Sequence, residues 1–350
     1  MPAEWEAHAG TWIAWPHYAG DWPGKFEPIQ WIYAEIVRNI ARGESVHIAI
    51  QNAAGERRAR HVLKLAAVPT RNVRFHSWPS DRVWTRDSFP TFVNAQSGRK
   101  LQLAACGWRF NGWAKYSNHK RDARMSGRMA AELAIPLLRP LAMAGSRERH
   151  LVLEGGAIDC NGRGSLLTTE ECLLSKVQQR NPGVGRTEYE ECFRKYLGIC
   201  NVIWLGKGVA GDDTHGHVDD IARFVAPRTV VAASERDPQD INYKPLKDNL
   251  QRLRRARDQA GRRLEVLELP MPGPIVFQGR RLPASYANFY ICNSAVLVPM
   301  FSDANDRIAL NLLARLFPSR KVVGIYSGDL IWGFGAMHCM TQQQPRVQSQ

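Results

Sequence analysis

The sequence lacks the features that mark exported, membrane-spanning or multidomain chains. No apolar run approaches the roughly 18 residues that a membrane span needs. The first residues, MPAEWEAH, are acidic and aromatic, without the basic start and apolar stretch of a signal peptide. No low-complexity linker divides the 350 residues. We therefore expect one domain over 1–341, a disordered tail at 342–350, no membrane partner and a cytoplasmic location.

Cysteine is present without the spacing of a disulfide framework or a zinc site. None of the seven cysteines forms a C-x-x-C pair, and Cys160, Cys172, Cys192 and Cys200 are irregularly spaced. Free thiols in a reducing compartment are the simplest account. Cys339 differs, because it follows a histidine at the end of a glycine-containing approach and precedes amide side chains. Two interpretations of it stay open here: a buried structural cysteine, and a thiolate nucleophile presented to a pocket.

Acidic residues are in the minority, and the formal net charge is +14 at pH 7. The densest basic stretch, 252–263, follows leucines at helical spacing, which indicates an amphipathic helix with a solvated basic face. No motif of nucleic-acid binding accompanies it. We therefore expect no nucleic-acid partner, and the surplus charge mainly favours solubility.

Short β-rich runs alternate with helical patterns along the chain. We expect strands at 46–50, 73–76, 89–93, 101–104, 157–159, 165–168, 201–204, 221–225, 229–232, 264–267, 289–292, 295–298 and 322–325. We expect helices at 29–42, 55–65, 123–133, 187–197, 243–259 and 304–316. Strand pairs separated by one helix recur, which predicts an α/β fold of repeated ββαβ-like units and not one doubly wound sheet.

Three polar segments lie at the edges of expected strands, where their side chains can face a common cavity. They are 84–90 (WTRDSFP), 153–159 (LEGGAID) and 211–220 (GDDTHGHVDD), and Cys339 is the fourth element. Each segment also has a structural interpretation: a surface ion pair, a Gly-Gly turn and a plain acidic loop. The acidic loop is the least satisfactory of these, because its four aspartates repel one another unless a cation or ligand balances them.

The third segment has two further interpretations. HGHVDD at 215–220 nearly matches the H-x-H-x-D-H ligand run of binuclear zinc hydrolases, but an aspartate stands in place of the last histidine. No histidine between His217 and His338 completes a second metal shell, so we expect no metal. Upstream, 206–211 matches G-x-G-x-x-G, yet an acidic loop follows where a helix N-terminus would hold a pyrophosphate. We expect no organic cofactor either.

A nucleophilic cysteine among carboxylates needs an explanation, because negative charge raises the pKa of a thiol and slows its attack. The arrangement makes sense for a cationic substrate. A guanidinium fits best, because it is planar, always charged and accepts bidentate carboxylate pairing on its edges. Two aspartates would clamp the group so that its central carbon faces the thiolate.

Five motifs then occur in one order: MPAEWEAH at 1–8 with GTWIAWPH at 10–17, WTRD at 84–87, EGG at 154–156, GDDTHGHVD at 211–219 and HCMTQQ at 338–343. In these motifs the chain resembles the agmatine deiminase family, a group that includes bacterial peptidylarginine deiminases and belongs to the guanidine-modifying pentein superfamily. The match runs nearly end to end.

The resemblance implies a five-bladed α/β propeller with the active site on its axis, and self-association. It implies guanidinium-binding roles for Asp87 and Asp219, a general acid/base role for His217, an orienting role for Glu154 and a nucleophilic role for Cys339. The thiolate would attack the guanidinium carbon and the histidine would protonate the departing ammonia. The histidine would then activate a water that hydrolyses the thiouronium intermediate. No metal or organic cofactor is implied.

The expected substrate is a small cationic guanidino compound. Agmatine comes first, giving N-carbamoylputrescine and ammonia, with free or peptidyl-arginine as the alternative. Asp212 and Asp213 are candidates for the distal ammonium of agmatine, and Arg86 is a candidate for the carboxylate of arginine. Trp84 is a further candidate substrate contact.

The chain departs from the family pattern around the nucleophile. Trp332 and Phe334 are bulky where the family has glycines, Ala336 replaces an amide, and Phe89 stands where glycine usually precedes proline. These changes keep the candidate catalytic side chains and alter the expected walls of the site. Two rival classes therefore stay open: a catalytically inactive pentein used for binding, and a metallohydrolase. The sequence determines the reaction type better than the substrate.

Overall fold

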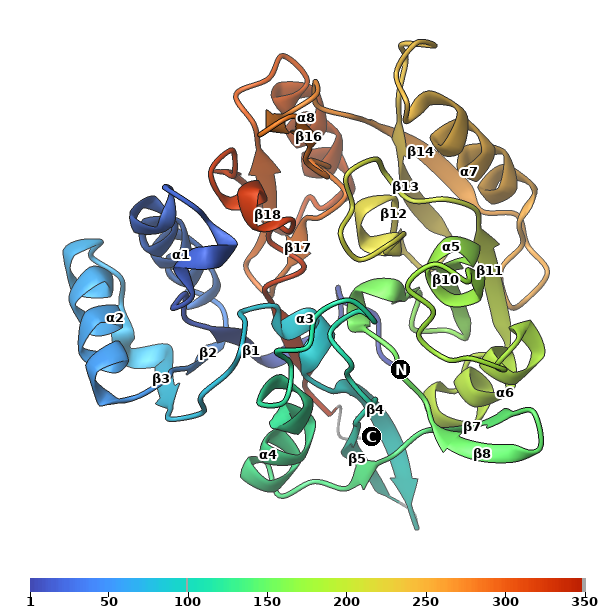
Figure 1. Cartoon of the computed structure of the whole chain (residues 1–350), viewed down its shortest axis with the longest axis horizontal. Coiled ribbons are helices and arrows are strands. Elements are labelled where there is room, and N and C mark those ends of the chain that lie inside the picture. The colour runs from blue at the N-terminus through green and yellow to red at the C-terminus, as the bar shows by residue number, and fades with distance from the viewer. Residues whose placement is uncertain (99, 348–350) are drawn as a thin grey trace.

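The computed structural model describes residues 1–98 and 100–347. Within them, five sheets repeat one arrangement, in which a central strand has an antiparallel neighbour on one side and a parallel neighbour on the other. In each sheet, a helix lies in the chain between the central strand and its parallel neighbour. Figure 1 shows the strands closer to the middle of the molecule and most of the long helices toward its rim. The chain therefore has a mixed α/β fold of ββαβ-like units, as predicted.

The first sheet has the order β20 (Gln342–Pro345), β1 (His8–Ala14), β2 (Ser45–Ala49) and β3 (Val73–His76). The other four are β4 (Thr91–Ser97), β5 (Lys100–Cys106), β6 (Leu137–Leu138); β9 (Asp159–Cys160), β10 (Ser165–Thr169), β11 (Asn201–Leu205); β12 (Ala222–Ala226), β13 (Thr229–Ser234), β14 (Glu265–Pro270); and β17 (Tyr290–Ile291), β18 (Ala295–Met300), β19 (Lys321–Tyr326). Two hairpins, β7 (Leu141–Ala144) with β8 (Arg147–His150) and β15 (Val276–Phe277) with β16 (Arg280–Arg281), lie in connections between these sheets.

The helices within the units are α1 (Phe26–Ile40), α2 (Ala53–Leu65), α4 (Met125–Glu132), α6 (Arg186–Leu197), α7 (Tyr243–Arg255) and α8 (Asp306–Leu316). Shorter turns of helix are α3 (Thr85–Ser88) and α5 (Glu170–Leu174), and the 3₁₀ turns η1 (Ala19–Asp21), η2 (Thr70–Asn72), η3 (Asp122–Arg124), η4 (Gly155–Ala157), η5 (Val218–Asp220) and η6 (Leu330–Gly333).

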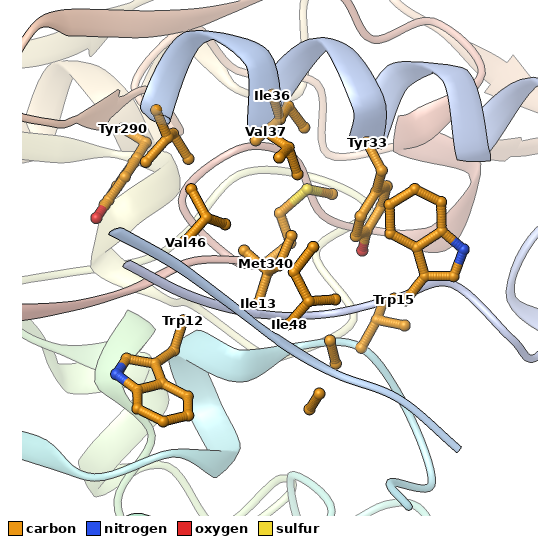
Figure 2. Packing of buried hydrophobic residues seen from close by; sticks show 14 of the residues in the cluster. Trp12, Ile13, Trp15, Tyr33, Ile36, Val37, Val46, Ile48, Tyr290 and Met340 are labelled. Carbon is orange, nitrogen blue, oxygen red and sulfur yellow. The ribbon is translucent and has the colours of Figure 1, made fainter. Parts of the chain in front are cut away.

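The core beside the site forms between α1 and the first sheet. Apolar residues recur along α1 at three- and four-residue spacing, and Tyr33, Ile36 and Val37 are fully buried against the sheet. Successive side chains of a strand point to opposite faces, so Ile13 faces α1 while Trp12 points to the other side (Figure 2). Both faces of β1 are buried, which holds this strand in place at the centre of the chain's first unit.

Residues 342–345 form the strand β20, so the prediction of a disordered tail starting at 342 is wrong for them. β20 pairs antiparallel with β1, and Gln344 Oε1 accepts a hydrogen bond from Trp12 Nε1 at 3.0 Å. An amide-rich segment looks solvated in the sequence, but here its amides satisfy buried donors. Residues 348–350 lie outside the described residues.

Every expected strand and helix overlaps an observed element; the strand at 73–76 coincides with β3, and the others differ at one or both ends. β1 was not predicted, because burial of both faces removes the apolar–polar alternation on which a strand prediction depends. Across the described residues, no helix combines the length and the apolar character that a membrane crossing requires.

Candidate active site

The five candidate catalytic residues meet at one place, although four separate segments supply them. Asp87 lies in α3, Glu154 directly precedes η4, His217 and Asp219 lie at η5, and Cys339 lies between η6 and β20. All five side chains are buried. Each of these segments connects one sheet of the fold to the next. The candidate catalytic residues therefore lie in the connections between units, which we call junctions.

A cavity of about 410 Å³ reaches this cluster, a size within the range of small-molecule sites. Trp84, Asp87 and Cys339 line it. Its walls include Tyr18, Asp21, Arg82, Trp113, Tyr116, Asp213, Phe277, Arg280, Trp332 and Phe334. The bulky pair noted in the sequence is therefore part of the wall, and Phe277 stacks on Trp332 with 3.7 Å between ring centroids. Phe89 is different: it packs in the hydrophobic core beside Trp12 and does not line the cavity.

The Cys339 thiol is held by one amide and surrounded by carboxylates. Asn288 Nδ2 donates to Sγ at 3.0 Å, and Asp219 Oδ2 lies 3.6 Å from Sγ. Burial, and then the neighbouring carboxyl groups of Asp219, Asp220 and Asp87, raise the pKa of Cys339 well above its usual value, while Asn288 opposes this shift. The thiol is therefore protonated near neutral pH unless positive charge is brought beside it.

His217 lies between two carboxylates. Its Nδ1 is 3.8 Å from Asp87 Oδ1, and its Nε2 is 3.6 Å from Glu154 Oε2. Burial lowers the pKa of His217, but the charge of Asp87 and the neighbouring Cys172 and Glu154 outweigh burial and raise this pKa well above its usual value. His217 is therefore an imidazolium that can donate a proton.

Arg180 holds the carboxylate of Glu154 in place. Its Nε donates to Glu154 Oε1 at 3.2 Å, and its terminal nitrogens donate to the carbonyl oxygens of Gln178 and Thr214. Burial raises the pKa of Glu154, but Arg180 and His217 more than offset this and lower it to about 2. Glu154 is therefore ionised near neutral pH and can orient the imidazole ring.

Asp87 is oriented by two donors. Trp113 Nε1 donates to Oδ2 at 2.8 Å, and the backbone N–H of Gly156 donates to Oδ1 at 3.1 Å. Burial raises the pKa of Asp87 to about 6, despite the opposing charge of His217. A Cβ atom on Gly156 would lie 2.5 Å from His217 Nδ1, so the contact between this loop and the imidazole requires glycine.

Asp219 is ionised and partly unsatisfied. Its Oδ2 lies 2.7 Å from His338 Nδ1, while its Oδ1 is buried with no hydrogen-bond partner among the described residues. Burial raises the pKa of Asp219, but the hydrogen bond and charge of His338 outweigh burial and lower it. The free oxygen can accept a hydrogen bond from a cationic ligand.

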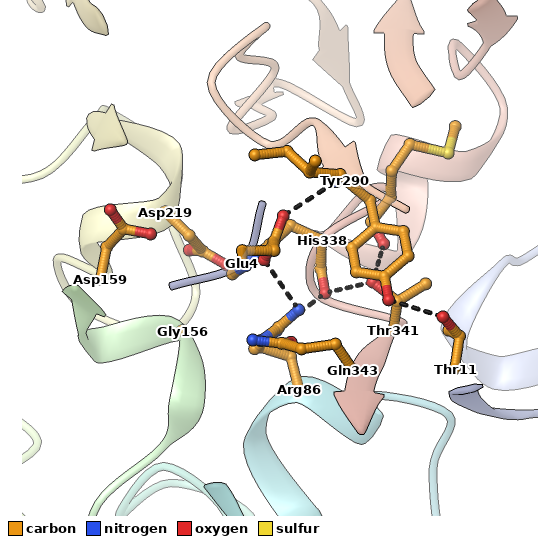
Figure 3. A network of polar contacts seen from close by, with 12 residues as sticks. Glu4, Thr11, Arg86, Gly156, Asp159, Asp219, Tyr290, His338, Thr341 and Gln343 are labelled. Atoms are coloured by element: carbon orange, nitrogen blue, oxygen red, sulfur yellow. Dashed lines mark hydrogen bonds and ion pairs between the residues drawn. The ribbon is translucent and has the colours of Figure 1, made fainter. Parts of the chain in front are cut away.

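Arg86 lies behind the cluster and not in the cavity wall. Its guanidinium donates to Gln343 Oε1 at 2.6 Å and to Glu4 Oε2 at 3.3 Å (Figure 3). Glu4 also pairs with Arg223 at 2.8 Å and with His338 at 2.8 Å. The prediction that Arg86 contacts substrate is therefore wrong: a buried guanidinium needs a carboxylate, and Glu4 supplies it.

The two adjacent acidic candidates for a distal ammonium also differ. Asp212 accepts hydrogen bonds from the backbone N–H groups of Thr214, Gly216 and His217, so it shapes its own loop. Asp213 lines the cavity. Of this pair, only Asp213 remains a candidate for substrate contact.

Sequence reasoning missed three residues that orient the cluster: Trp113, Arg180 and Asn288. They share no motif with the residues they contact and lie far from them in the chain. The run 285–290 (SYANFY), dense in aromatic and small polar residues just before β17, was the one local signal for Asn288.

Cys172, Glu154 and His217 are also the group of potential metal ligands among the described residues, with donor atoms within 4.8 Å of one another. Arg180 already bonds Glu154, and its fixed positive charge disfavours a cation at the same carboxylate. We therefore interpret this cluster as a proton-transfer group and not as a metal centre.

Comparisons with known proteins show which proteins the chain is similar to. The family model of the Porphyromonas-type peptidyl-arginine deiminases matches residues 1–345. An agmatine deiminase of Pseudomonas fluorescens is 36% identical, with 99% of this chain and 96% of that protein covered. The agmatine deiminase structure of Enterococcus faecalis is 28% identical with a TM-score of 0.87, and a C. jejuni agmatine deiminase variant with substrate bound is 26% identical with a TM-score of 0.83. Each comparison covers 99% of this chain and 96% of the other.

Proposed function

The chain belongs to the Porphyromonas-type peptidyl-arginine deiminase family, and we propose that it hydrolyses agmatine to N-carbamoylputrescine and ammonia. The observation that carries this proposal is the meeting of a thiol, an imidazolium and two aspartates beside one cavity, which Cys339 and Asp87 line. This set suits a guanidinium, which is planar and offers N–H donors on each edge. The agmatine deiminases similar to this chain over its full length support agmatine as the molecule that carries the group.

In this proposal the guanidinium lies between Asp87 and Asp219, with its central carbon facing Cys339 Sγ. Asp219 Oδ1 is free to accept an N–H, and each Asp87 oxygen keeps one lone pair beyond its present hydrogen bond. The two carboxylates come from different junctions of the fold, so they can hold opposite edges of the cation.

The substrate activates the nucleophile. Carboxylates raise the pKa of the Cys339 thiol, so a guanidinium bound between them offsets their charge and lowers that pKa again. The thiol then loses its proton to solvent through the cavity. His217 stays protonated, because Asp87 and Glu154 lie on either side of it. Thiolate and imidazolium are thus present together.

The reaction follows in two halves. The thiolate forms a C–S bond with the guanidinium carbon, and His217 gives its proton to one amino nitrogen, which leaves as ammonia. The resulting S-alkylthiouronium is attacked by water, whose proton returns to the now neutral His217. The C–S bond breaks, and the product is a urea. Glu154 holds the ring in position through both transfers.

The position of Arg86 removes the contact expected for the carboxylate of arginine. Arg86, the candidate for the carboxylate of arginine, is already paired with Glu4 behind the site. Asp213 lies on the cavity wall, where a distal ammonium competes with the cations that hold this carboxylate, and Trp84 supplies an aromatic surface in the same wall.

We also propose that the five ββαβ-like units are the blades of a closed five-bladed propeller in one catalytic domain. β20 completes the first sheet from the other end of the chain, and every junction between units supplies a residue at the site, with Asn288 on the fourth. An axial site is the arrangement that brings all junctions together. The cytoplasmic location stays a prediction, which cell fractionation tests.

Replacement of Cys339 with alanine tests the reaction. Ammonia release from agmatine should fall by at least about four orders of magnitude, because the covalent route is lost. Iodoacetamide should inactivate the wild type, and a chelator should not. A panel of agmatine, arginine and an arginyl peptide identifies the substrate. Activity retained by Cys339→Ala, or abolished by the chelator, would contradict the proposed mechanism.

A further inference from the structure

Asp213, the carboxylate on the cavity wall, is already bound by two cations. Lys115 Nζ lies 2.5 Å and Arg280 Nη2 lies 2.7 Å from Asp213 Oδ1, and Tyr116 Oη donates to Oδ2 at 2.5 Å. Burial raises the pKa of Asp213, but these three hydrogen bonds outweigh it and lower that pKa. Asp213 is therefore ionised and its oxygens are occupied.

Arg280 reaches this carboxylate from the solvent side of the cavity. Its side chain is 46% exposed, against 9% for Asp213, and it belongs to the hairpin β15–β16. Its guanidinium carbon lies 4.3 Å from the ring centroid of Phe334, one of the bulky residues noted before the nucleophile. Arg280 therefore bridges Asp213 and Phe334 on the solvent-exposed side of the cavity wall.

The charge at this end is positive. Asp21 and Arg82 pair with each other on the wall, which leaves one carboxylate, Asp213, with two cations. A distal ammonium can reach Asp213 only by replacing one of them. An uncharged distal group binds without displacing a cation from Asp213. A distal carboxylate is attracted to the surplus positive charge.

We propose that Arg280 is a specificity-determining residue that competes with the distal ammonium of a guanidino substrate for Asp213. This inference rests on the proposed deiminase function and adds to it a charge filter at the distal end. This competition weakens the binding of agmatine relative to that of guanidino compounds of similar length with an uncharged or anionic end. Exposed ion pairs are weak, so agmatine displaces Arg280 and still binds.

The test uses Arg280→Gln and three compounds of similar length: agmatine, butylguanidine and 4-guanidinobutyrate. KM and kcat are measured for each, and a compound that is not turned over is measured by its inhibition constant against agmatine. The KM ratio of agmatine to butylguanidine should fall about two- to fivefold, the scale of one exposed ion pair. The corresponding ratio for 4-guanidinobutyrate should rise by a similar factor, and the kcat ratios should stay within twofold.

Arg281→Gln is the matched control. Arg281 is the next residue on the same strand, pairs with Asp240 at 2.6 Å and does not line the cavity, so its loss should leave the ratios unchanged. Equal KM changes for all three compounds in Arg280→Gln, or a higher ratio for agmatine, would overturn the role of Arg280. A wild type that releases no ammonia from any of the three overturns the proposed function instead.

Discussion

At the scale of single residues, Asp219 and Asp220 show how tertiary contacts give two adjacent aspartates different pKa values. Hydrogen bonding to His338 outweighs burial and lowers the pKa of Asp219. Burial, together with the charges of Asp219 and Asp212, raises the pKa of Asp220 well above its usual value. Asp220 is therefore a neutral acid that accepts a hydrogen bond from Asn288 Nδ2 at 3.0 Å. Asp219 is the charged member of the pair.

These two aspartates should respond differently to the same isosteric change. Asp220→Asn should keep most of the activity, because an amide resembles the protonated carboxyl that stands there. Asp219→Asn should lower kcat/KM for agmatine by about a hundredfold or more, the scale of losing one charge contact to the reacting group. Steady-state kinetics on both variants, with circular dichroism to confirm folding, measures this. Equal losses in the two variants would contradict the assignment of charge.

At the scale of elements, the site is built from connections and not from strands. α3, η4, η5 and the loop after η6 each carry a reacting residue from one sheet to the next. β20 is the element that holds the last of these loops, because it pairs with β1 directly after Cys339. Gln343 of β20 also bonds Arg86, so the strand supports the buried charges behind the nucleophile.

Removal of β20 should therefore damage both stability and activity. A chain ending at Thr341 leaves Trp12 Nε1 without Gln344 and Arg86 Nη1 without Gln343, and each buried donor left unsatisfied costs about 1–3 kcal/mol. We expect a loss of at least about 2 kcal/mol in the free energy of unfolding, measured by urea denaturation, and loss of ammonia release. A chain ending at Val347 is the control. Equal free energies of unfolding for the chains ending at Thr341 and Val347 would show that β20 does not stabilise the fold.

At the scale of the whole molecule, Glu4 joins distant parts of the chain. It pairs with Arg223 of β12 and accepts the backbone N–H of Ile291 in β17. It also pairs with Arg86 of α3 and with His338, which lie beside it in Figure 3. Burial raises the pKa of Glu4, but Arg223 and His338, followed by Arg86, outweigh it and place this pKa well below its usual value. One ionised carboxylate thus balances several buried cations.

Glu4→Gln should reduce the free energy of unfolding by about 3–5 kcal/mol at pH 7, because it leaves the buried Arg86 without a carboxylate and Arg223 with Asp159 alone. The pKa of Glu4 is lowered on folding, so its carboxylate stabilises the fold above the ordinary carboxyl pKa. That contribution is lost as the pH falls through the folded-state pKa. The difference in stability between the wild type and Glu4→Gln should therefore become smaller at acidic pH. Thermal unfolding measured over a range of pH tests this. Glu6→Gln, on the same segment, should change stability by less than about 0.5 kcal/mol.

Much of the site was predictable because it is made from local motifs. Asp87, Glu154, His217 and Asp219 each lie at a glycine-bearing or charged turn beside a strand, and Cys339 follows such a turn. Their convergence could be expected, since polar residues at strand edges face common cavities. Asn288, Arg180 and Trp113 could not be predicted in the same way, because their partners are distant in the chain and only the fold places them in contact.

The amino-acid sequence by itself determined the period of strands and helices and the set of side chains that suits a guanidinium. Both are local properties that follow from the spacing and the types of the residues. Tertiary structure alone decided how the charges are used: Arg86 pairs with Glu4, Asp220 keeps its proton, and Asp213 is held by Arg280. The reason is physical: pairing and pKa depend on burial and on distances between groups far apart in the chain.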